Sequence, residues 1–249
     1  MEKILLYTQT LDPKIIIEAV GDRAVTSVSS RMQLAETIVE NKNLLCLLIE
    51  IDGLDEEVNQ FLQSLRKQFP ILNVGVITRD TKADLPEGYS RIDLRLEKDA
   101  LAQELRHLLS SLAVTNRRAH NRFNFPLKGY LSTDGKSWRE YPLSALSASG
   151  AFLECERDLP TPDTKGVLRI VFQNFKMVTQ CEVLSPRHAS SNFPIGFGVR
   201  FTDLTRASEV IIDQFVNEAL VHSLVEPDYE APTPSLEDDN LLTPNFEPG

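Results

Sequence analysis

The sequence predicts two folded parts. The first is a doubly wound α/β domain built on a five-stranded parallel sheet, and the second is a small six-stranded antiparallel β-barrel followed by a C-terminal helix. Over residues 1–113, short apolar runs alternate with amphipathic stretches of helical period, as in a parallel sheet covered by helices. From Arg122 onward the apolar period is two, and no long helix separates the strands that follow.

The first part is expected to alternate strands with helices. The run LLCLLIEI at 44–51 is apolar throughout, as expected of a central strand covered on both faces. Only about a dozen residues, including Pro86 and Gly88, separate the last two strands, so we expect a loop there in place of a helix. The predicted strands are 4–8, 24–30, 44–51, 71–78 and 90–96, and the predicted helices are 13–20, 31–42, 54–69 and 97–112.

Capping residues and prolines define the ends of these helices. Asp12 and Ser30 can each accept a hydrogen bond from the first turn of the helix that follows. Pro13 is tolerated at a first helical position, whereas Pro70 ends the third helix because proline cannot continue it. These boundaries support the alternating pattern.

The second part is expected to fold as a barrel closed by a helix. Asp134-Gly135 lies between two runs of period two and predicts a hairpin turn. A helix at 207–225 should pack on the barrel through one apolar stripe. The predicted strands are two within 125–146 and one each at 150–156, 166–175, 176–186 and 195–204, and the predicted stripe is Val210, Ile211, Phe215, Ala219 and Leu220.

The sequence divides into domains at 1–113 and 114–224 and a tail at 225–249. The last 24 residues, 226–249, contain seven acidic and no basic side chains and several prolines. Such a segment buries too little apolar surface to offset its conformational entropy. We therefore expect the tail to be disordered.

The composition indicates a cytoplasmic globular protein. No apolar run approaches the roughly 20 residues of a membrane span, and the chain does not begin with a secretory signal. In a reducing compartment Cys46, Cys155 and Cys181 are expected to be buried thiols. Neither the cysteines nor the four histidines have the spacing of metal ligands, so no metal site is predicted.

The net charge of −10 is unevenly distributed. Residues 1–110 contain 13 basic and 18 acidic side chains, whereas residues 111–225 contain 13 and 11. Basic charge confined to one module of an acidic chain favours a small anionic ligand over a nucleic acid polymer.

The first domain resembles the receiver domains of response regulators, which share its five-stranded layout. The resemblance implies an acidic pair after the first strand, a phosphorylated Asp after the third, a Thr or Ser after the fourth and a Lys after the fifth. Here the first strand ends in TQT, and only Thr78 matches its place. Glu50 and Asp52 are the only carboxylates at the end of the third strand, and Lys98 belongs to a helix start. We expect a receiver-like domain that is not phosphorylated, with Asp52 as the one acceptor left.

The segment NRRAHNR at 116–122 opens the second domain. Arg117, Arg118 and Arg122 fall within six positions, and the nearest acidic residues are Glu104 and Asp134. Guanidinium groups bond bidentately to phosphates and to the O6/N7 edge of guanine, and they stack on purines. The segment is therefore either a solvated basic linker or half of an anion site.

Two further motifs give the second domain a resemblance to the PilZ family, the bacterial module that binds cyclic di-GMP. RAHNR matches the family motif RxxxR, ALSASG matches [D/N]xSxxG at Ser147 and Gly150, and IGFGVRFTDL matches the last barrel strand. The resemblance spans about 114–222. It implies that Arg118 and Arg122 bind the dinucleotide with help from Arg117, and that Ser147 and Gly150 line the opposite wall.

One position departs from this family pattern. Ala145 stands where the family has Asp or Asn, whose oxygen accepts hydrogen bonds from guanine. Losing a hydrogen bond to a charged group costs about 1.5–3 kcal/mol, or roughly 10- to 100-fold in affinity. Ser144 or Ser149 could substitute for the lost acceptor. The aromatic residues Trp138, Tyr141 and Phe152 could stack on a base, although such residues are more often core.

We therefore expect a non-enzymatic bacterial signalling effector that binds cyclic di-GMP, with no other cofactor. Ordering of the segment 114–124 around the ligand would pass the signal to a protein partner through the receiver-like domain, which could also form a homodimer. The alternative is a ligand-independent adaptor in motility or polarity control, which Ala145 keeps open. A phosphorylated response regulator with a PilZ output is a third possibility.

Overall fold

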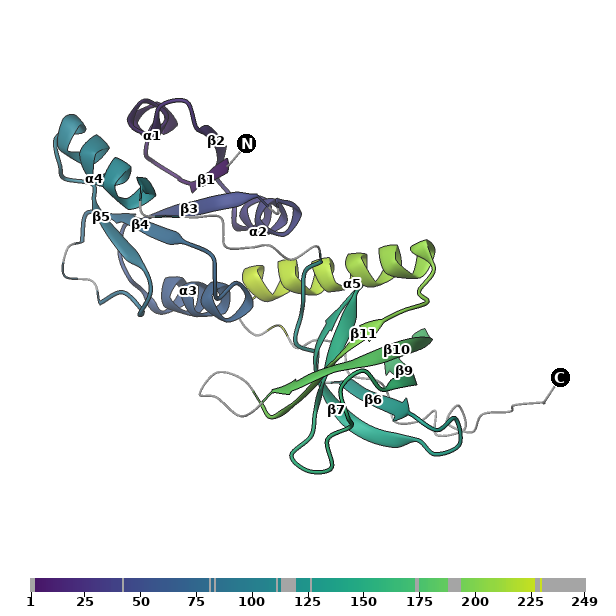
Figure 1. Ribbon diagram of the computed structural model, residues 1–249. Coiled ribbons are helices and arrows are strands. Elements are labelled where there is room, and N and C mark those ends of the chain that lie inside the picture. The colour runs from purple at the N-terminus through teal and green to yellow at the C-terminus, as the bar shows by residue number, and fades with distance from the viewer. Residues whose placement is uncertain are drawn as a thin grey trace. The chain divides into compact units, whose positions relative to one another are not determined.

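The computed structural model of the chain describes residues 3–41, 43–80, 82, 84–110, 112, 120–125, 127–172, 175–187, 194–226 and 229 (Figure 1). The chain forms two compact units. Unit 1 comprises Met1–Asn121 and Asn217–Tyr229, and Arg122–Val216 falls in unit 2. The domain boundary predicted between residues 113 and 114, and nearly all of the tail predicted at 225–249, lie outside the described residues.

Unit 1 is the predicted doubly wound α/β domain. Its five strands are all parallel, in the order β2-β1-β3-β4-β5. The loop expected between the last two strands is confirmed, since the described residues between β4 and β5 form no helix. The strands are β1 Lys3–Tyr7, β2 Ala24–Val28, β3 Leu44–Ile51, β4 Val74–Thr78 and β5 Ser90–Asp93, and the helices are α1 Pro13–Val20, α2 Arg31–Glu40, α3 Glu56–Gln68 and α4 Lys98–Ser110.

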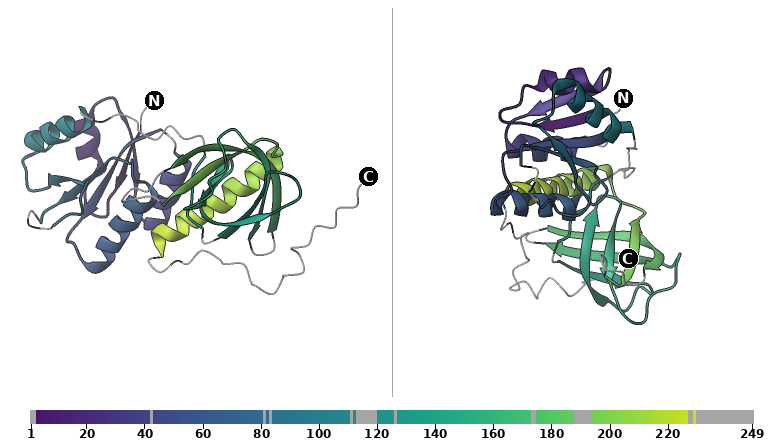
Figure 2. Two further views of the ribbon diagram at one scale, coloured as in Figure 1. Left: turned by 60° about the horizontal axis from the view of Figure 1, so that its bottom comes forward. Right: turned by 90° about the vertical axis from the view of Figure 1, so that its left-hand side faces the viewer.

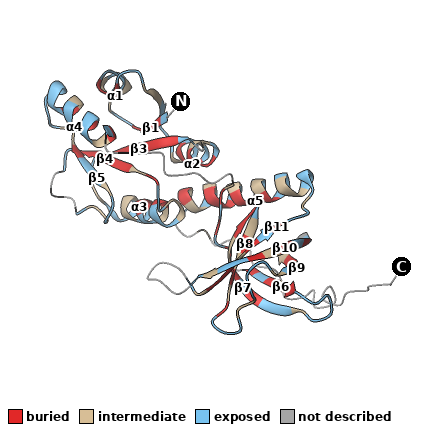
Figure 3. Cartoon of the chain, in the orientation of Figure 1, coloured by how far each residue is buried: buried red, intermediate tan, exposed pale blue. Residues whose placement is uncertain are grey.

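The apolar run of β3 fits its place as the central strand of this sheet. All eight β3 residues are buried, as Figure 3 shows. Leu47 and Ile49 join the core cluster on the side of α2 and α3, whereas Leu48 and Cys46 join the cluster on the side of α1 and α4. Alternate side chains of the strand thus fill two cores, and Figure 2 shows helices on both faces of the sheet.

The predicted helix caps are confirmed. The side chain of Asp12 accepts a hydrogen bond from the N–H of Lys14, and the side chain of Ser30 accepts one from the N–H of Gln33. The third helix begins two residues later than predicted because Asp55, rather than a residue before it, provides its cap. The strands predicted at 71–78 and 90–96 are also shorter than expected.

Unit 2 contains the predicted antiparallel barrel. Six strands close in the order β10-β11-β8-β7-β6-β9. The predicted turn at Asp134-Gly135 joins the first two, with Gly135 at a φ of 71°. The strands are β6 Leu127–Ser132, β7 Arg139–Ser147, β8 Gly150–Glu154, β9 Lys165–Phe172, β10 Phe175–Arg187 and β11 Gly196–Phe201.

The last helix, α5 (Arg206–Val225), divides between the two units. Its first half belongs to unit 2, where Phe215 stacks on Phe125 with ring centroids 4.6 Å apart. Its second half belongs to unit 1, where Leu224 joins the core cluster of α2 and α3. A second contact within unit 1 is the amide of Asn121, which donates to the backbone oxygen of Val39.

The predicted apolar stripe of this helix was wrong at its start. Val210 and Ile211 are half exposed, and Ile212 and Val216 are buried instead. The sequence contains adjacent isoleucines at 211 and 212, so helical spacing alone fits either register. Ala219 and Leu220, which were expected to pack on the barrel, are buried but belong to unit 1.

Truncating Leu224 tests the place of the helix end in unit 1. Leu224 is 3% exposed, and we expect Leu224→Ala to lower the free energy of unfolding by about 2–3 kcal/mol, because a large buried side chain leaves a cavity. The measurement is urea unfolding of the full chain followed by circular dichroism. Val210→Ala, in the same helix but 50% exposed, is the matched control and should change little. Equal effects of the two substitutions would contradict the assignment.

Candidate functional site

The paired strands β7, β8 and β11 form one face of the barrel. Along this face Phe152 pairs with Ala145 on one side and with Gly198 on the other. Two residues further along, Gly150 pairs with Ser147 and with Arg200 in the same way. Side chains alternate across a strand, and the residues between these two rows point into the barrel core. Those inward residues, all buried, are Leu146, Ala151 and Val199.

Glycine lets the strands of this face approach closely. A Cβ atom at Gly150 would lie 2.1 Å from the backbone oxygen of Val199 on β11. A Cβ atom at Gly196 would lie 2.1 Å from the backbone oxygen of Leu153 on β8. The glycine of the ALSASG motif is therefore required by the barrel itself.

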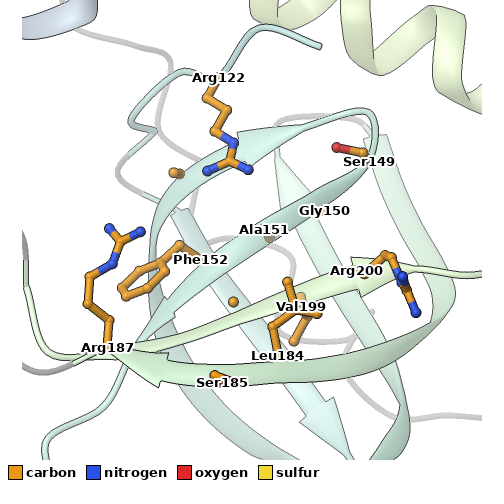
Figure 4. Close-up of a pocket in the computed structure, with 12 residues that line it drawn as sticks. Arg122, Ser149, Gly150, Ala151, Phe152, Leu184, Ser185, Arg187, Val199 and Arg200 are labelled. Carbon is orange, nitrogen blue, oxygen red and sulfur yellow. The ribbon is translucent and has the colours of Figure 1, made fainter. Parts of the chain in front are cut away.

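A pocket of about 310 Å³ lies on this face. Three arginines from separate segments border it: Arg122 precedes β6, Arg187 ends β10, and Arg200 lies on β11. Figure 4 shows Arg187 beside Phe152, Arg122 above both of them, and Arg200 on the other side of Val199 from Phe152. None of the described residues that line the pocket is acidic. The pocket therefore suits an anion.

The three arginines are held differently. The backbone just after Arg122 is fixed to β7 by two hydrogen bonds. The N–H of Phe123 donates to the backbone oxygen of Leu146 (3.1 Å), and the N–H of Leu146 donates to the backbone oxygen of Phe123 (2.9 Å). Arg200 forms an ion pair of 2.9 Å with Glu182, its cross-strand partner on β10.

Arg187 lies over an aromatic ring. Its Cζ atom is 5.0 Å from the ring centroid of Phe152, a cation–π distance. Arg187 pairs across the strands with Gly196, and a Cβ at Gly196 would come within 2.9 Å of the Phe152 ring. The Phe152 ring therefore lies against the backbone of Gly196, where the absence of a Cβ leaves room for its contact with the guanidinium of Arg187.

The predicted site residues are only partly brought together. Arg122, Ala145 and Gly150 line the pocket, whereas Arg117 and Arg118 lie outside the described residues. Ser147 is 1% exposed and does not line the pocket. Its hydroxyl donates to the backbone oxygen of Gly150 (3.1 Å) and lies 3.2 Å from the hydroxyl of Ser149, so it holds the β7–β8 turn. Ser149, named as a substitute acceptor, lines the pocket.

Sequence reasoning missed Arg187 and Arg200. Strand alternation could have found Arg200, since it places Arg200 on the same face as Gly198. Of the three aromatics that were expected either to stack on a base or to lie in the core, Tyr141 is buried, whereas Phe152 is half-buried and lines the pocket. Trp138 lies under the guanidinium of Arg169, with Cζ 4.8 Å from its ring.

In unit 1, Glu50 is the acceptor of a hydrogen-bond network at the carboxyl edge of the parallel sheet. Its carboxylate accepts hydrogen bonds from the hydroxyls of Thr8 and Thr10 and from the N–H groups of Gln9, Thr10 and Leu11. Burial by itself raises the pKa of Glu50, but the bonds from Thr10, Thr8 and Leu11 outweigh it and lower the pKa to about 2. The carboxylate thus acts as a fixed anchor for the loop after β1.

The other residues at positions of the receiver pattern are Asp52, Lys98 and Thr78. Asp52 is exposed and shares a pocket of about 250 Å³ with Glu50. Lys98 forms an ion pair with Glu18 of α1. The buried hydroxyl of Thr78 accepts from the N–H of Asp80.

Three observations concern the described residues as a whole. No cluster of three His, Cys, Asp or Glu side chains that could hold a metal ion occurs among them. None of the helices they form is both long and apolar enough to cross a membrane. All three cysteines are buried thiols, as predicted.

Solved structures similar to this chain include MotI/DgrA, the inhibitor of motility of Bacillus subtilis (11% identity, TM-score 0.39), over 44% of this chain and 53% of that one. The PilZ domain of YcgR from Escherichia coli with c-di-GMP matches at 13% identity and a TM-score of 0.35, over 41% and 90% of the two chains. The MrkH–c-di-GMP complex of K. pneumonia matches at 13% identity and 0.36, over 45% and 55%. The matched region thus spans about half the length of MotI/DgrA and of MrkH.

No curated protein is similar enough in sequence to count as a relative. The model of the PilZ family matches residues 116–218, the stretch that contains the arginine segment, the ALSASG turn and all six barrel strands. The closed antiparallel barrel followed by a helix is the fold that this match leads one to expect. Residues 116–218 of the chain are a PilZ domain.

Proposed function

We propose that this protein is a bacterial signalling effector that binds cyclic di-GMP on the outer face of its barrel. The observation that carries the proposal is the pocket of about 310 Å³, which is bordered by three guanidinium groups and by no described acidic side chain. Arg122 of the RxxxR motif and Gly150 of the xSxxG motif both line it.

The chemistry of the pocket fits a cyclic dinucleotide. The ligand offers two phosphates and two guanines, and each can take a bidentate pair of hydrogen bonds from an arginine. Arg117 and Arg118 would add two further guanidiniums from the segment just before Arg122. Ala145 offers no acceptor, so we expect weaker binding than an Asp or Asn at this position would give.

The signal would pass through protein contacts rather than through catalysis. In this proposal the segment 114–124 orders around the ligand and thereby changes the surface that a protein partner meets. The receiver-like domain serves as the platform for that partner or for a homodimer. Cyclic di-GMP is the ligand, and no other cofactor takes part.

Unit 1 is proposed to act without phosphorylation. Glu50 is fully occupied by the loop after β1, and Lys98 is paired with Glu18, so neither is placed to assist an acyl phosphate on Asp52. A receiver needs a carboxylate pair to hold Mg²⁺ against the phosphoryl oxygens. The Glu50 network supports a structural role for this edge of the sheet.

Calorimetric titration of the full chain with cyclic di-GMP tests the proposal. We expect saturable binding by the wild type, a loss of about 10- to 100-fold in affinity for Arg122→Ala and for Arg118→Ala, and a gain of similar size for Ala145→Asp. Arg206→Ala, an exposed arginine at the start of α5, is the control and should bind like the wild type.

Three outcomes would contradict the proposal. Absence of wild-type binding up to high micromolar ligand would favour the ligand-independent adaptor, the alternative that Ala145 supports. Binding restored only by Ala145→Asp would show a site that has lost one essential wall. Equal binding by Arg122→Ala and the wild type would place the ligand elsewhere.

A further inference from the structure

A groove of about 340 Å³ lies between two helices of unit 1 and shares no residue with the arginine pocket. One wall comes from α2 and the other from the second half of α5, and all of the described lining residues belong to unit 1. On each helix these residues recur at the spacing of a single helical face. The lining residues of this α2–α5 groove are Met32, Glu36, Val39, Glu40, Asn217, Glu218, Val221 and His222.

Three of the lining residues are apolar. Val39 is buried, and Val221 packs against the core cluster of α2 and α3. Met32, in contrast, is 42% exposed although its side chain is large and apolar. The unbranched side chain of methionine adapts its shape to an incoming apolar group. The α2–α5 groove therefore offers an adaptable apolar surface to an apolar side chain of a partner.

The two walls of the groove are held together within unit 1. The side-chain amide of Asn121 donates to the backbone oxygen of Val39 (3.0 Å) and to the side-chain oxygen of Asn217 (2.8 Å), so it connects α2 to α5. Leu224 of α5 and Leu34 of α2 also lie in one core cluster. The groove is therefore formed before a partner binds, and this lowers the conformational entropy lost on binding.

The charged lining residues are mostly acidic. Glu36, Glu40 and Glu218 are exposed, and no lysine or arginine is among the described lining residues. The salt bridges among the described residues do not involve Glu36 or Glu218, whereas His222 is paired with Glu226 at 3.0 Å. Exposed carboxylates around an apolar surface attract lysine and arginine side chains of a partner.

We propose that the α2–α5 groove binds a basic amphipathic helix of a partner protein. Apolar side chains of that helix enter the groove, and its lysines and arginines meet the glutamates. Recognition of a helix in a groove combines apolar anchors at helical spacing with charge complementarity. The inference rests on the proposed function in that it names the face through which unit 1 serves as the platform, but binding of the helix does not require cyclic di-GMP.

Charge decides against other occupants of the groove. Residues 226–249 contain seven acidic and no basic side chains, so the tail of the chain and the glutamates repel each other. Nucleic acids and anionic membranes are repelled for the same reason. A second copy of the chain has a net charge of −10, which also opposes its approach.

Fluorescence anisotropy of labelled synthetic peptides, titrated with the full chain in the absence of cyclic di-GMP, tests the inference. The probe is a helical peptide of about 15 residues made of leucine and lysine, with the leucines on one face. In one control peptide glutamate replaces lysine, and in the other serine replaces leucine. We expect saturable binding of the leucine–lysine peptide and affinities at least about 10-fold lower for both controls.

Three variants locate the peptide on the protein. Glu36→Lys combined with Glu218→Lys should lower the affinity at least about 10-fold. Glu87→Lys combined with Glu156→Lys makes the same change in net charge at exposed positions outside the groove, and should stay within about threefold of the wild type. Met32→Glu adds an attractive charge but removes an apolar contact, and should lower the affinity at least about threefold. Only binding in the groove predicts a loss from both added bases and an added acid.

Four results would overturn the inference. Equal binding of the leucine–lysine and serine–lysine peptides would show attraction by net charge alone, as would tighter peptide binding by Met32→Glu. Equal losses in the two double-lysine variants would place the peptide outside the groove. A dimer in sedimentation equilibrium that Glu36→Lys combined with Glu218→Lys dissociates would make a second copy the occupant.

Calorimetry with cyclic di-GMP separates this inference from the proposed function. Glu36→Lys combined with Glu218→Lys should bind cyclic di-GMP like the wild type, and unchanged thermal unfolding would show that this variant is folded. Peptide binding by a wild type that does not bind cyclic di-GMP would overturn the proposed function alone. Cyclic di-GMP binding by a wild type that binds none of the peptides would overturn this inference alone.

Discussion

Replacement of Gly150 by alanine is expected to unfold the barrel of unit 2. The new Cβ would lie 2.1 Å from the backbone oxygen of Val199, far inside van der Waals contact. Because the new Cβ is attached directly to the backbone of β8 and the oxygen belongs to the backbone of β11, no side-chain rotation can relieve the clash. β8 and β11 would have to separate, at an expected cost of more than about 4 kcal/mol.

Chemical unfolding of the full chain, followed by circular dichroism, measures this effect. Gly198→Ala is the matched control on the same face of the barrel. Its Cβ would meet the tip of the Leu184 side chain at 3.3 Å, and that side chain can shift. We expect a change of less than about 1 kcal/mol for the control. A Gly150→Ala variant as stable as the control would contradict the close approach of the strands.

Replacement of Glu50 by glutamine is expected to destabilise unit 1 by about 4 kcal/mol. The carboxylate accepts hydrogen bonds from two hydroxyls and from three backbone N–H groups. An amide turns its NH₂ group toward some of these donors and leaves them unsatisfied, at about 1–3 kcal/mol for each buried group. Asp52→Asn, at an exposed carboxylate of the same pocket, is the control and should cost little.

The effect of Glu50 should depend on pH. Its pKa falls from an ordinary value of 4.5 to about 2 on folding, so the unfolded chain binds more protons between these values. The stabilisation by the carboxylate, about 3 kcal/mol, is complete above the unfolded pKa and is lost as the pH falls toward 2. Urea unfolding at pH 7, 4 and 3 should show the wild type and Glu50→Gln approaching each other as pH decreases. A constant difference would contradict the assigned pKa.

The sequence allowed both sheets to be predicted because their patterns are local. The apolar run at 44–51 and the alternation after Arg122 each depend on neighbouring residues only, and the structure confirms both. Neighbouring residues alone could not predict which face of α5 is buried. Ile211 and Ile212 fit a helical stripe equally well, and only the surface that the helix packs against decides which one is buried.

The candidate site was predictable in part for a similar reason. Arg122 and Gly150 lie in short motifs, and both line the pocket. Arg187 lies at the end of β10, about 65 residues from Arg122, and reaches the pocket only because the barrel closes β10 beside β11. Ser147 was expected to face a ligand, but the tight turn turns its hydroxyl toward Gly150 instead.

The division of α5 has a consequence for how such proteins can evolve. Residues 217–225 are encoded at the far end of the barrel sequence, yet Leu224 completes the core of the α/β unit. A gene fusion that exchanged residues 1–113 for an unrelated domain would leave the apolar end of this helix without the core it fits. The α/β unit and the end of α5 should therefore be inherited together, and substitutions in α2 or α3 should be accompanied by compensating substitutions near Leu224.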